Sequence, residues 1–475
     1  MNNDAPTLQE IIQLTRQELV TPQKSDPIRE CGRAALALLP EDPELGLKLA
    51  YQKLHDVPYK EVKTCWRRLY TDATLWKVLK RVDGRIEEQR QGTTESDWID
   101  EVVKSLDMAL ILAGAPSREE LVELWFAALR ADLDRVYPTN GISSERPSKR
   151  QKLSLPCQSS PIPERFPVEL PNPEPVLSHP LQRMKELSLE AFQRKVGSTE
   201  THTPCIIKDA IQHWPALSER PWANPDYLLR QTLGGRRLIP VEVGKSYTAE
   251  GWGQRIITFR EFMETYMLHN PNNPLHPPQD STANSVGYLA QHDLFAQIPS
   301  LRLDITIPDY CYTDPAPSPR LTHIKPVPKL EEPLLNAWFG PAGTVSPLHT
   351  DPYHNILAQV VGYKYVRLYA PSETQRLYPR SVDECGVDMS NTSEIDLDEA
   401  MEVFPRLSWF EKPVMGVALD DEEKKKKFRQ RFPGFQDAVF VEGILGPGEC
   451  LYLPVGWWHY VRSLTPSFSV SFWFN

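Results

Sequence analysis

The chain has 475 residues, 40% of them hydrophobic, and a formal net charge of −10. This length suits two or three domains, and the apolar content is sufficient for buried cores, which excludes a wholly disordered chain. An acidic chain has no global positive field, so we expect no direct binding to nucleic acid.

Seven cysteines are dispersed along the chain without a C-x-x-C pair, a pattern that favours neither a disulfide framework nor a structural zinc site. The first residues have neither the basic start nor the apolar segment of a secretory signal. The longest apolar runs are far shorter than a membrane span. We therefore expect an intracellular protein without a membrane segment.

Residues 1–137 are predicted to form an all-helical domain, because their apolar residues recur at helical spacing. We expect this domain to offer a surface for a protein partner. The expected helical segments are Leu8–Leu19, Ile28–Leu39, Leu45–Leu54, Val62–Val82, Ile99–Ala113 and one that starts near Ser117.

Residues 138–180 are rich in proline and serine and are predicted to be a linker. Within them, Pro147–Lys152 contains a Lys-Arg-x-Lys cluster that is typical of a nuclear localisation signal. The alternative is an ordinary solvated group of charges. The pattern predicts a nuclear protein, with the cytoplasm as a second compartment.

Residues 181–475 consist of short strand-like runs separated by proline and glycine, which predicts a double-stranded β-helix, or jelly roll, rather than βαβ units. The expected fold class is therefore α+β. Irregular insertions are expected at 312–333 and 380–435. Within the second, the charged run Asp420–Lys427 indicates either an exposed helix or a mobile loop. The predicted strands are Pro204–Ile207, Leu238–Val243, Ile256–Phe259, Asn336–Phe339, Asn355–Val361, Lys364–Tyr369, Cys450–Leu453 and Ser467–Phe474.

A candidate metal site begins with His349 and Asp351, which are separated by one residue on a predicted strand or strand end. Because side chains alternate along a strand, the imidazole and the carboxylate point to the same side. His459 follows another apolar strand and is the expected third ligand. Two histidines and one carboxylate form the facial triad of non-haem Fe(II) oxygenases, which leaves three coordination positions open.

Three further residues fit a co-substrate close to this metal. Lys364 starts the next predicted strand, and a lysine buried in a barrel needs an anionic partner such as a dicarboxylate. Asn355 is six residues after His349, so strand parity places it on the same side if the strand is regular. Ser346 could donate its hydroxyl to the same ligand, although both polar residues could instead cap a turn.

Residues 334–372 resemble the Jumonji-C hydroxylases, and the resemblance extends over about 165–475. It is carried by long, specific stretches. These stretches include Pro240–Gly244, Gly287–His292, Ile307–Cys311, Trp458–Arg462 and Phe468–Trp473.

The resemblance implies a jelly-roll catalytic domain that uses Fe(II), 2-oxoglutarate and O2. It implies that the metal is held by His349, Asp351 and His459, and that Lys364 binds the distal carboxylate of 2-oxoglutarate. The other implied co-substrate residues are Tyr288, Ser346 and Asn355, and the implied substrate-side residues are Glu242, Tyr247, Trp252 and Trp338.

The resemblance also implies a protein or peptide substrate with a cationic arginine or lysine side chain, with histones among the candidates. The family is linked to arginine hydroxylation, to demethylation of a histone H3 lysine, and to histone-tail cleavage. Three functions therefore stay open: a protein hydroxylase acting on arginine, a histone lysine demethylase, and a catalytically silent binding scaffold. For Glu242, the alternative to a substrate-binding role is an ion pair within the fold.

Overall fold

The structure is a computed structural model that describes residues 5–20, 25–91, 98–136, 162–171, 175–198, 202–249, 251–268, 286–317, 321, 324, 326–383, 386–408 and 419–475. The chain divides into two compact units. One comprises Met1–Pro161 with Thr232–Leu238, and the other comprises Ile162–Gln231 with Ile239–Asn475. The basic cluster at 147–152 lies outside the described residues, as does part of the predicted insertion at 312–333.

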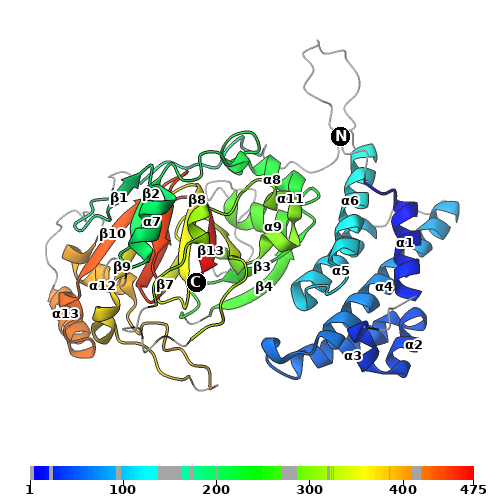
Figure 1. Ribbon diagram of the computed structural model, residues 1–475, viewed down its shortest axis with the longest axis horizontal. Helices are drawn as coiled ribbons and strands as arrows, with labels where there is room; N and C mark the ends of the chain where they lie inside the picture. The colour runs from blue at the N-terminus through cyan, green and yellow to red at the C-terminus, as the bar shows by residue number, and fades with distance from the viewer. Residues whose placement is uncertain are drawn as a thin grey trace, which may run out of the picture. The chain divides into compact units, whose positions relative to one another are not determined.

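The first unit is helical, as predicted (Figure 1). Asp42 begins α3 by accepting a hydrogen bond from the Leu45 amide, and Pro43 occupies the first turn. The indole of Trp125 on α6 donates to the Thr15 hydroxyl on α1 at 2.8 Å, which joins the first and last helices inside a buried apolar cluster. Its helices are α1 (Leu8–Val20), α2 (Arg33–Glu41), α3 (Pro43–His55), α4 (Thr64–Gln91), α5 (Trp98–Ala113) and α6 (Glu119–Val136), with 3₁₀ turns at Pro27–Cys31 and Tyr59–Glu61.

The second unit contains two facing sheets, which confirms the predicted jelly roll. The larger sheet has the order β1-β2-β11-β8-β13-β6-β5-β3-β4, and the smaller has the order β10-β9-β12-β7. The strands are β1 (Arg183–Lys185), β2 (Cys205–Lys208), β3 (Leu238–Val243), β4 (Gly253–Thr258), β5 (Gly287–His292), β6 (Leu334–Gly340), β7 (Val345–His349), β8 (His354–Val361), β9 (Lys364–Tyr369), β10 (Phe440–Leu445), β11 (Cys450–Leu453), β12 (Trp458–Ser463) and β13 (Ser467–Phe474).

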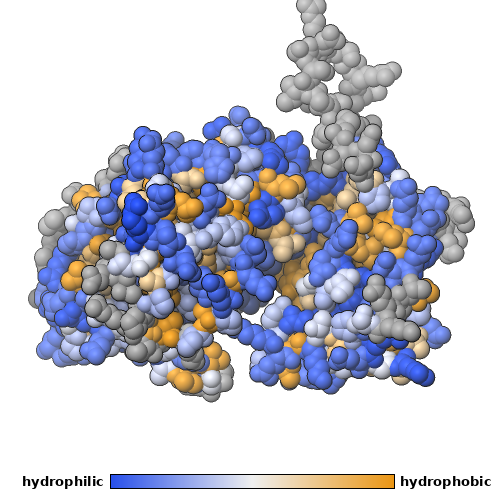
Figure 2. Space-filling view, viewed as in Figure 1, coloured by the Kyte–Doolittle hydropathy of each residue, from blue (hydrophilic) through white to orange (hydrophobic). Residues whose placement is uncertain are grey.

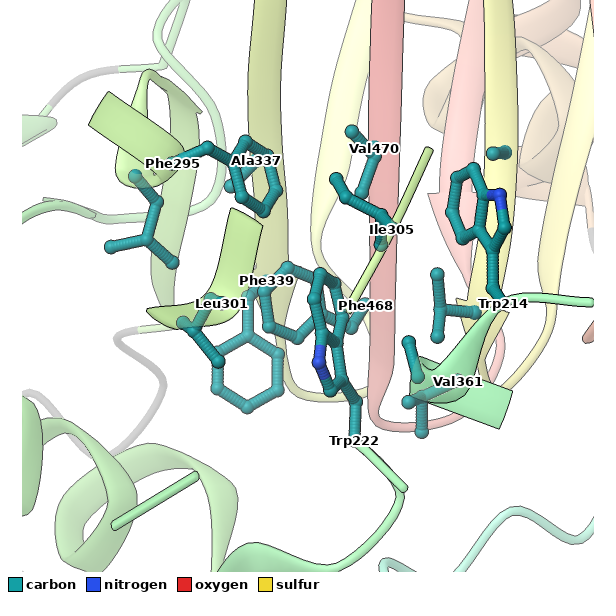
Figure 3. Packing of buried hydrophobic residues seen from close by; sticks show 14 of the residues in the cluster. Trp214, Trp222, Phe295, Leu301, Ile305, Ala337, Phe339, Val361, Phe468 and Val470 are labelled. Carbon is teal, nitrogen blue, oxygen red and sulfur yellow. The ribbon is translucent and has the colours of Figure 1, made fainter. Parts of the chain in front are cut away.

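Helices cover the outer face of each sheet (Figure 1). Those on the larger sheet pack through the cluster in Figure 3, where Phe468 lies 4.4 Å from Trp222 and 4.6 Å from Phe339 between ring centroids. Those on the smaller sheet pack through Phe404 and Phe428. The helices are α7 (Leu189–Val196), α8 (Pro225–Gln231), α9 (Phe259–Phe262), α10 (Leu294–Gln297) and α11 (Pro299–Arg302) on the larger sheet, and α12 (Leu397–Val403) and α13 (Leu419–Arg431) on the smaller.

The inner faces of the two sheets meet in a separate apolar cluster. Leu357 and Leu453 come from the larger sheet, and Val366, Leu368 and Val461 come from the smaller one. Since side chains alternate along a strand, residues two positions from these also face inward. This parity identifies the residues that line the interior of the jelly roll.

The structure differs from the predicted organisation in two places. Phe166, in the second half of the predicted linker, is buried, and its amide donates to the Ala223 carbonyl at 3.0 Å, so that half packs on the second unit. In the 380–435 insertion, α13 agrees with the helix that was one of the two alternatives for Asp420–Lys427. The insertion is nevertheless not irregular, because it also carries α12, and Phe428 and Phe432 of α13 are buried in the cluster on the smaller sheet. Both segments hold large aromatic residues that a solvated linker or loop would expose.

The surface is mostly polar, and Figure 2 shows hydrophobic residues on the visible face of the second unit only as small separate patches. Among the described residues, no helix has the length and apolar character needed to cross a membrane.

Candidate metal and co-substrate site

The candidate metal site lies where β7 pairs with β12. His349 and His459 are opposite each other in this antiparallel pair, and their ring centroids are 4.0 Å apart. On β12, His459 is two residues before Val461, which belongs to the inner cluster, so both imidazoles face the interior. Residues 110 positions apart in the sequence therefore meet through strand pairing.

Asp351 completes the group just beyond the end of β7. Its Oδ1 lies 3.8 Å from His349 Nε2, and its Oδ2 lies 3.6 Å from His459 Nε2. One ligand atom from each of the three residues lies within 4.8 Å of the others. These separations fit three donors around one ion, because metal–ligand bonds of about 2 Å place neighbouring donors roughly 3 Å apart.

Backbone carbonyls orient both imidazoles. His349 Nδ1 donates to the Pro347 carbonyl at 2.7 Å, and His459 Nδ1 donates to the Trp457 carbonyl at 3.1 Å. A proton on Nδ1 leaves the lone pair on Nε2, the atom that faces Asp351. Fixing the tautomer and ring orientation in this way is typical of histidines that bind metals.

The electrostatics of the group favour a cation. Burial raises the pKa of Asp351, with partial opposition from the nearby His349. Burial and His349 together hold the pKa of His459 well below its usual value, so this imidazole is neutral. A buried carboxylate beside the neutral His459 imidazole is a poorly solvated anion, and a bound metal ion would relieve that cost.

A β-bulge in β7 brings Ser346 onto the same inner face as His349. His459 pairs with His349 and Val461 pairs with Ser346, so three residue steps on β7 oppose two on β12. The extra residue in β7 compensates for the odd spacing between the two side chains. Ser346 thereby faces the interior, in hydrogen-bond contact with Tyr288.

Lys364 is a buried cation on the inner face of β9. It is 2% exposed, and its Nζ donates to the Tyr288 hydroxyl at 3.1 Å. No carboxylate among the described residues forms an ion pair with it, and burial lowers the pKa of its ammonium to about 7. A lysine in this state is a ready partner for an anionic ligand.

Asn355 also faces the interior of the jelly roll, as expected. The expected reason, alternation along one strand from His349, is wrong. The two residues lie on different strands of different sheets, β7 and β8, so no alternation connects them. Asn355 instead faces inward because it is two residues before Leu357 of the inner cluster. Its Oδ1 is buried and has no hydrogen-bond partner among the described residues.

Four residues form the predicted substrate side. Glu242 on β3 is opposite Tyr288 on β5, and its carboxylate accepts a hydrogen bond from the Trp252 indole at 3.3 Å. Tyr247 places its ring edge-on to His349, with centroids 6.5 Å apart. Trp338 lies 6.0 Å from Tyr288 between ring centroids, and its indole donates to the Ser471 hydroxyl at 2.9 Å.

Comparison with known proteins identifies the family. The family model of the cupin-like domain matches residues 190–475. "Lysine-specific demethylase 8" of Danio rerio is 34% identical over 436 residues, covering 92% of this chain and 87% of that protein. "Lysine-specific demethylase JMJ30" of Arabidopsis thaliana is 33% identical over 449 residues, covering 91% and 85%. The chain belongs to the Jumonji-C family of cupin-like oxygenases.

Among more distant Jumonji-C relatives is the human "Bifunctional peptidase and (3S)-lysyl hydroxylase JMJD7", which is 28% identical over 57% of this chain and 77% of its own length. The family membership makes this chain a 2-oxoglutarate-dependent oxygenase.

The residues present fit the family's metal and co-substrate. The donor set of two imidazoles and one carboxylate suits a divalent transition metal. The Lys364 ammonium is hydrogen-bonded to the Tyr288 hydroxyl but forms no ion pair with a described carboxylate, and the buried Asn355 Oδ1 has no described hydrogen-bond partner. Buried groups of this kind normally have one, so a polar ligand is the natural occupant of this interior.

Other histidines near the motifs have structural partners. His354 Nδ1 lies 3.0 Å from the Tyr452 hydroxyl, and burial lowers its pKa to about 3. His292 Nε2 lies 2.7 Å from the Gln297 side-chain oxygen. Neither belongs to the candidate metal group among the described residues.

Sequence reasoning missed the segment 391–393 of this Jumonji-C protein, which lies against the metal-binding end of β7. Thr392 forms an antiparallel bridge with His349. The segment is more than 40 residues from His349 and lies within the predicted insertion at 380–435. No local pattern in the sequence therefore indicates that it contacts β7.

Proposed function

We propose that this protein binds Fe(II) at His349, Asp351 and His459, and hydroxylates an arginine side chain of a protein substrate. The observation that carries the choice of substrate is Glu242, a largely buried carboxylate on the inner side of the site. No described arginine or lysine forms an ion pair with it, and burial raises its pKa, with a smaller opposing effect from Trp252.

The proposed roles follow from the positions of the side chains. The triad holds one face of the metal and leaves the opposite face for ligands. Lys364 pairs with the distal carboxylate of 2-oxoglutarate, and Tyr288, Ser346 and Asn355 hydrogen-bond to the co-substrate. When bound, iron, 2-oxoglutarate and O2 would supply the oxidising chemistry, in which one oxygen atom of O2 enters the succinate formed as the oxo acid loses CO2, and the other enters the substrate.

The substrate side favours a guanidinium. A carboxylate accepts the paired N–H donors of arginine in a fixed planar geometry, and the faces of Trp252 and Tyr247 can stack on that plane. The Trp252 indole donates a hydrogen bond to one oxygen of Glu242 and so orients the carboxylate. Glu242 is therefore proposed to hold the arginine so that one of its side-chain carbon atoms would face the metal-binding residues.

Lysine demethylation is a second candidate, in which the first product is a hydroxymethyl amine that releases formaldehyde. It is supported by the names of the two relatives that cover most of this chain. Aromatic side chains at Tyr247, Trp252 and Trp338 also suit a methylated ammonium through cation–π attraction. A free carboxylate beside them is less useful to a fully methylated ammonium, which has no N–H donor.

Mass spectrometry of reacted peptides separates the candidates. The purified protein, Fe(II) and 2-oxoglutarate are incubated with peptides that differ only in carrying arginine, methylated lysine or unmodified lysine at one position. A gain of one oxygen on the arginine peptide, with matching succinate release, supports the proposal. Loss of a methyl group from the lysine peptide would favour demethylation, and absence of both iron binding and succinate would favour the scaffold.

We further propose a nuclear protein whose helical unit binds a protein partner. The basic cluster at 147–152 supports the compartment, and the separate apolar cores of the helical unit support an independent binding module. Lys149→Ala combined with Arg150→Ala in a fluorescent fusion tests the first point, since loss of nuclear accumulation is expected.

A further inference from the structure

The backbone around the metal-binding end of β7 is held from outside the sheet by three consecutive residues, Asn391, Thr392 and Ser393. The Thr350 amide donates to the Asn391 carbonyl at 2.8 Å, and the Ser393 amide donates to the Leu348 carbonyl at 2.9 Å. These two bonds flank His349, which bridges to Thr392. We call residues 391–393 the ligand clamp.

Asn391 contacts both backbone polar groups of Thr350, the residue between the two proposed metal ligands. Its backbone carbonyl accepts from the Thr350 amide, and its side-chain Nδ2 donates to the Thr350 carbonyl at 3.5 Å. Thr350 separates His349 from Asp351, so a rotation of its backbone would change the distance between those ligands. A single residue outside the sheet thus fixes the geometry of two donors.

The clamp also reaches the substrate side. Thr392 is 1% exposed, and its hydroxyl donates to Asn391 Oδ1 at 3.3 Å and lies 3.5 Å from the Tyr247 hydroxyl. Tyr247 lies edge-on to His349. A chain of polar contacts therefore runs from the proposed substrate wall through Thr392 and Asn391 to the backbone between the ligands.

We propose that Asn391 and Thr392 are positioning residues for the metal site, which rests on the metal-binding role proposed for His349 and Asp351. Neither touches the metal; each acts by fixing the backbone that carries the ligands. Their loss should weaken metal affinity while leaving the maximal rate at saturating metal nearly unchanged, because the donor atoms themselves are retained. Residues that orient ligands typically contribute about tenfold or more to metal affinity.

The test titrates the full-length apoprotein with Mn(II), a redox-stable probe, and follows free Mn(II) by electron paramagnetic resonance. Asn391→Ala is the main variant, because Asn391 is exposed and its truncation leaves no cavity. Thr392→Val removes the hydroxyl while keeping the branched shape, and Thr392→Ser restores it. Ser390→Ala, an exposed neighbour in the same turn, is the matched control.

We expect Asn391→Ala to weaken Mn(II) binding by about tenfold, Thr392→Val to weaken it less, and Thr392→Ser and Ser390→Ala to bind as the wild type does. Excess Fe(II) should then restore the maximal rate of Asn391→Ala. Wild-type affinity in Asn391→Ala, or an equal loss in Ser390→Ala, would overturn the role of the clamp. If the wild-type protein itself failed to bind Mn(II), the proposed metal site would fall instead.

Discussion

Lys364 and Tyr288 meet inside the jelly roll, with the lysine Nζ 3.1 Å from the tyrosine hydroxyl. A hydroxyl is a weak partner for a buried ammonium, and no described carboxylate forms an ion pair with this lysine. Burial lowers the pKa of Lys364 to about 7. In the absence of an anionic ligand, about half of the Lys364 side chains should therefore be protonated near pH 7.

The affinity for 2-oxoglutarate should depend on pH in a defined direction. Below pH 7 the lysine is already charged and binds the dicarboxylate directly. Above pH 7 it is neutral, and binding must take up a proton, so the dissociation constant should rise by up to about tenfold per pH unit until the raised pKa of the complex is reached. Calorimetric titration from pH 6 to pH 9 in buffers of different ionisation enthalpy measures both the affinity and the proton uptake.

Replacing the buried lysine should stabilise the protein while removing its co-substrate affinity. We expect Lys364→Met to raise the free energy of unfolding of the ligand-free protein at pH 6, because a methionine has no charge to desolvate. The stabilisation by Lys364→Met should decrease as the pH rises from about 7, the pKa of the buried lysine, toward 10.5, its ordinary pKa. Above that pH the wild-type lysine is neutral in the unfolded chain as well, so its burial desolvates no charge. Chemical denaturation at several pH values, with exposed Lys185→Met as control, checks this; equal stabilisation by both variants would contradict it.

Removal of one metal ligand should abolish both metal binding and turnover. His349→Ala leaves two donors from the group of three, so we expect Mn(II) affinity to fall by at least about a hundredfold and succinate release to stop. His213→Gln, which alters an exposed histidine elsewhere, should match the wild type. Succinate release at the normal rate by His349→Ala would rule out the assigned ligands.

Glu242 should decide how the substrate binds without affecting the co-substrate. Glu242→Gln keeps the size of the side chain and removes its charge, so the KM of an arginine peptide should rise by about tenfold or more. The affinity for 2-oxoglutarate should stay unchanged, because Lys364 and the triad are intact. Exposed Glu264→Gln is the control, and an unaltered KM in Glu242→Gln would place the cation elsewhere.

Much of the catalytic fold could be predicted because its buried strands are strongly apolar. The predicted bounds of β9 (364–369), β11 (450–453) and β13 (467–474) agree with the structure. The bounds of β7 and β12 were not predicted; β7 contains Pro347, a residue that is unusual inside a strand. Tertiary pairing with β9 and with each other overrides these local preferences.

The three candidate metal ligands could be predicted because their residue types are those that bind metals. The residues that hold the backbone of these ligands could not be predicted in this way. His349, Asp351 and His459 are an unusual combination wherever they occur near strands. Asn391, by contrast, is an ordinary turn residue that acts through its backbone and a single amide. Contacts of that kind are set by the path of a distant loop, which no periodicity in the sequence describes.

The bulge in β7 also has an evolutionary meaning. Ser346 and His349 face the same side of the sheet only because the bulge places one extra residue between them. The length of β7 between these two residues therefore cannot change without loss of this arrangement. Deleting Leu348 would turn either the hydroxyl or the imidazole out of the barrel, and no point substitution could restore it. In related proteins, a hydroxyl residue that serves the co-substrate should accordingly be sought three positions ahead of the first metal-binding histidine rather than two or four.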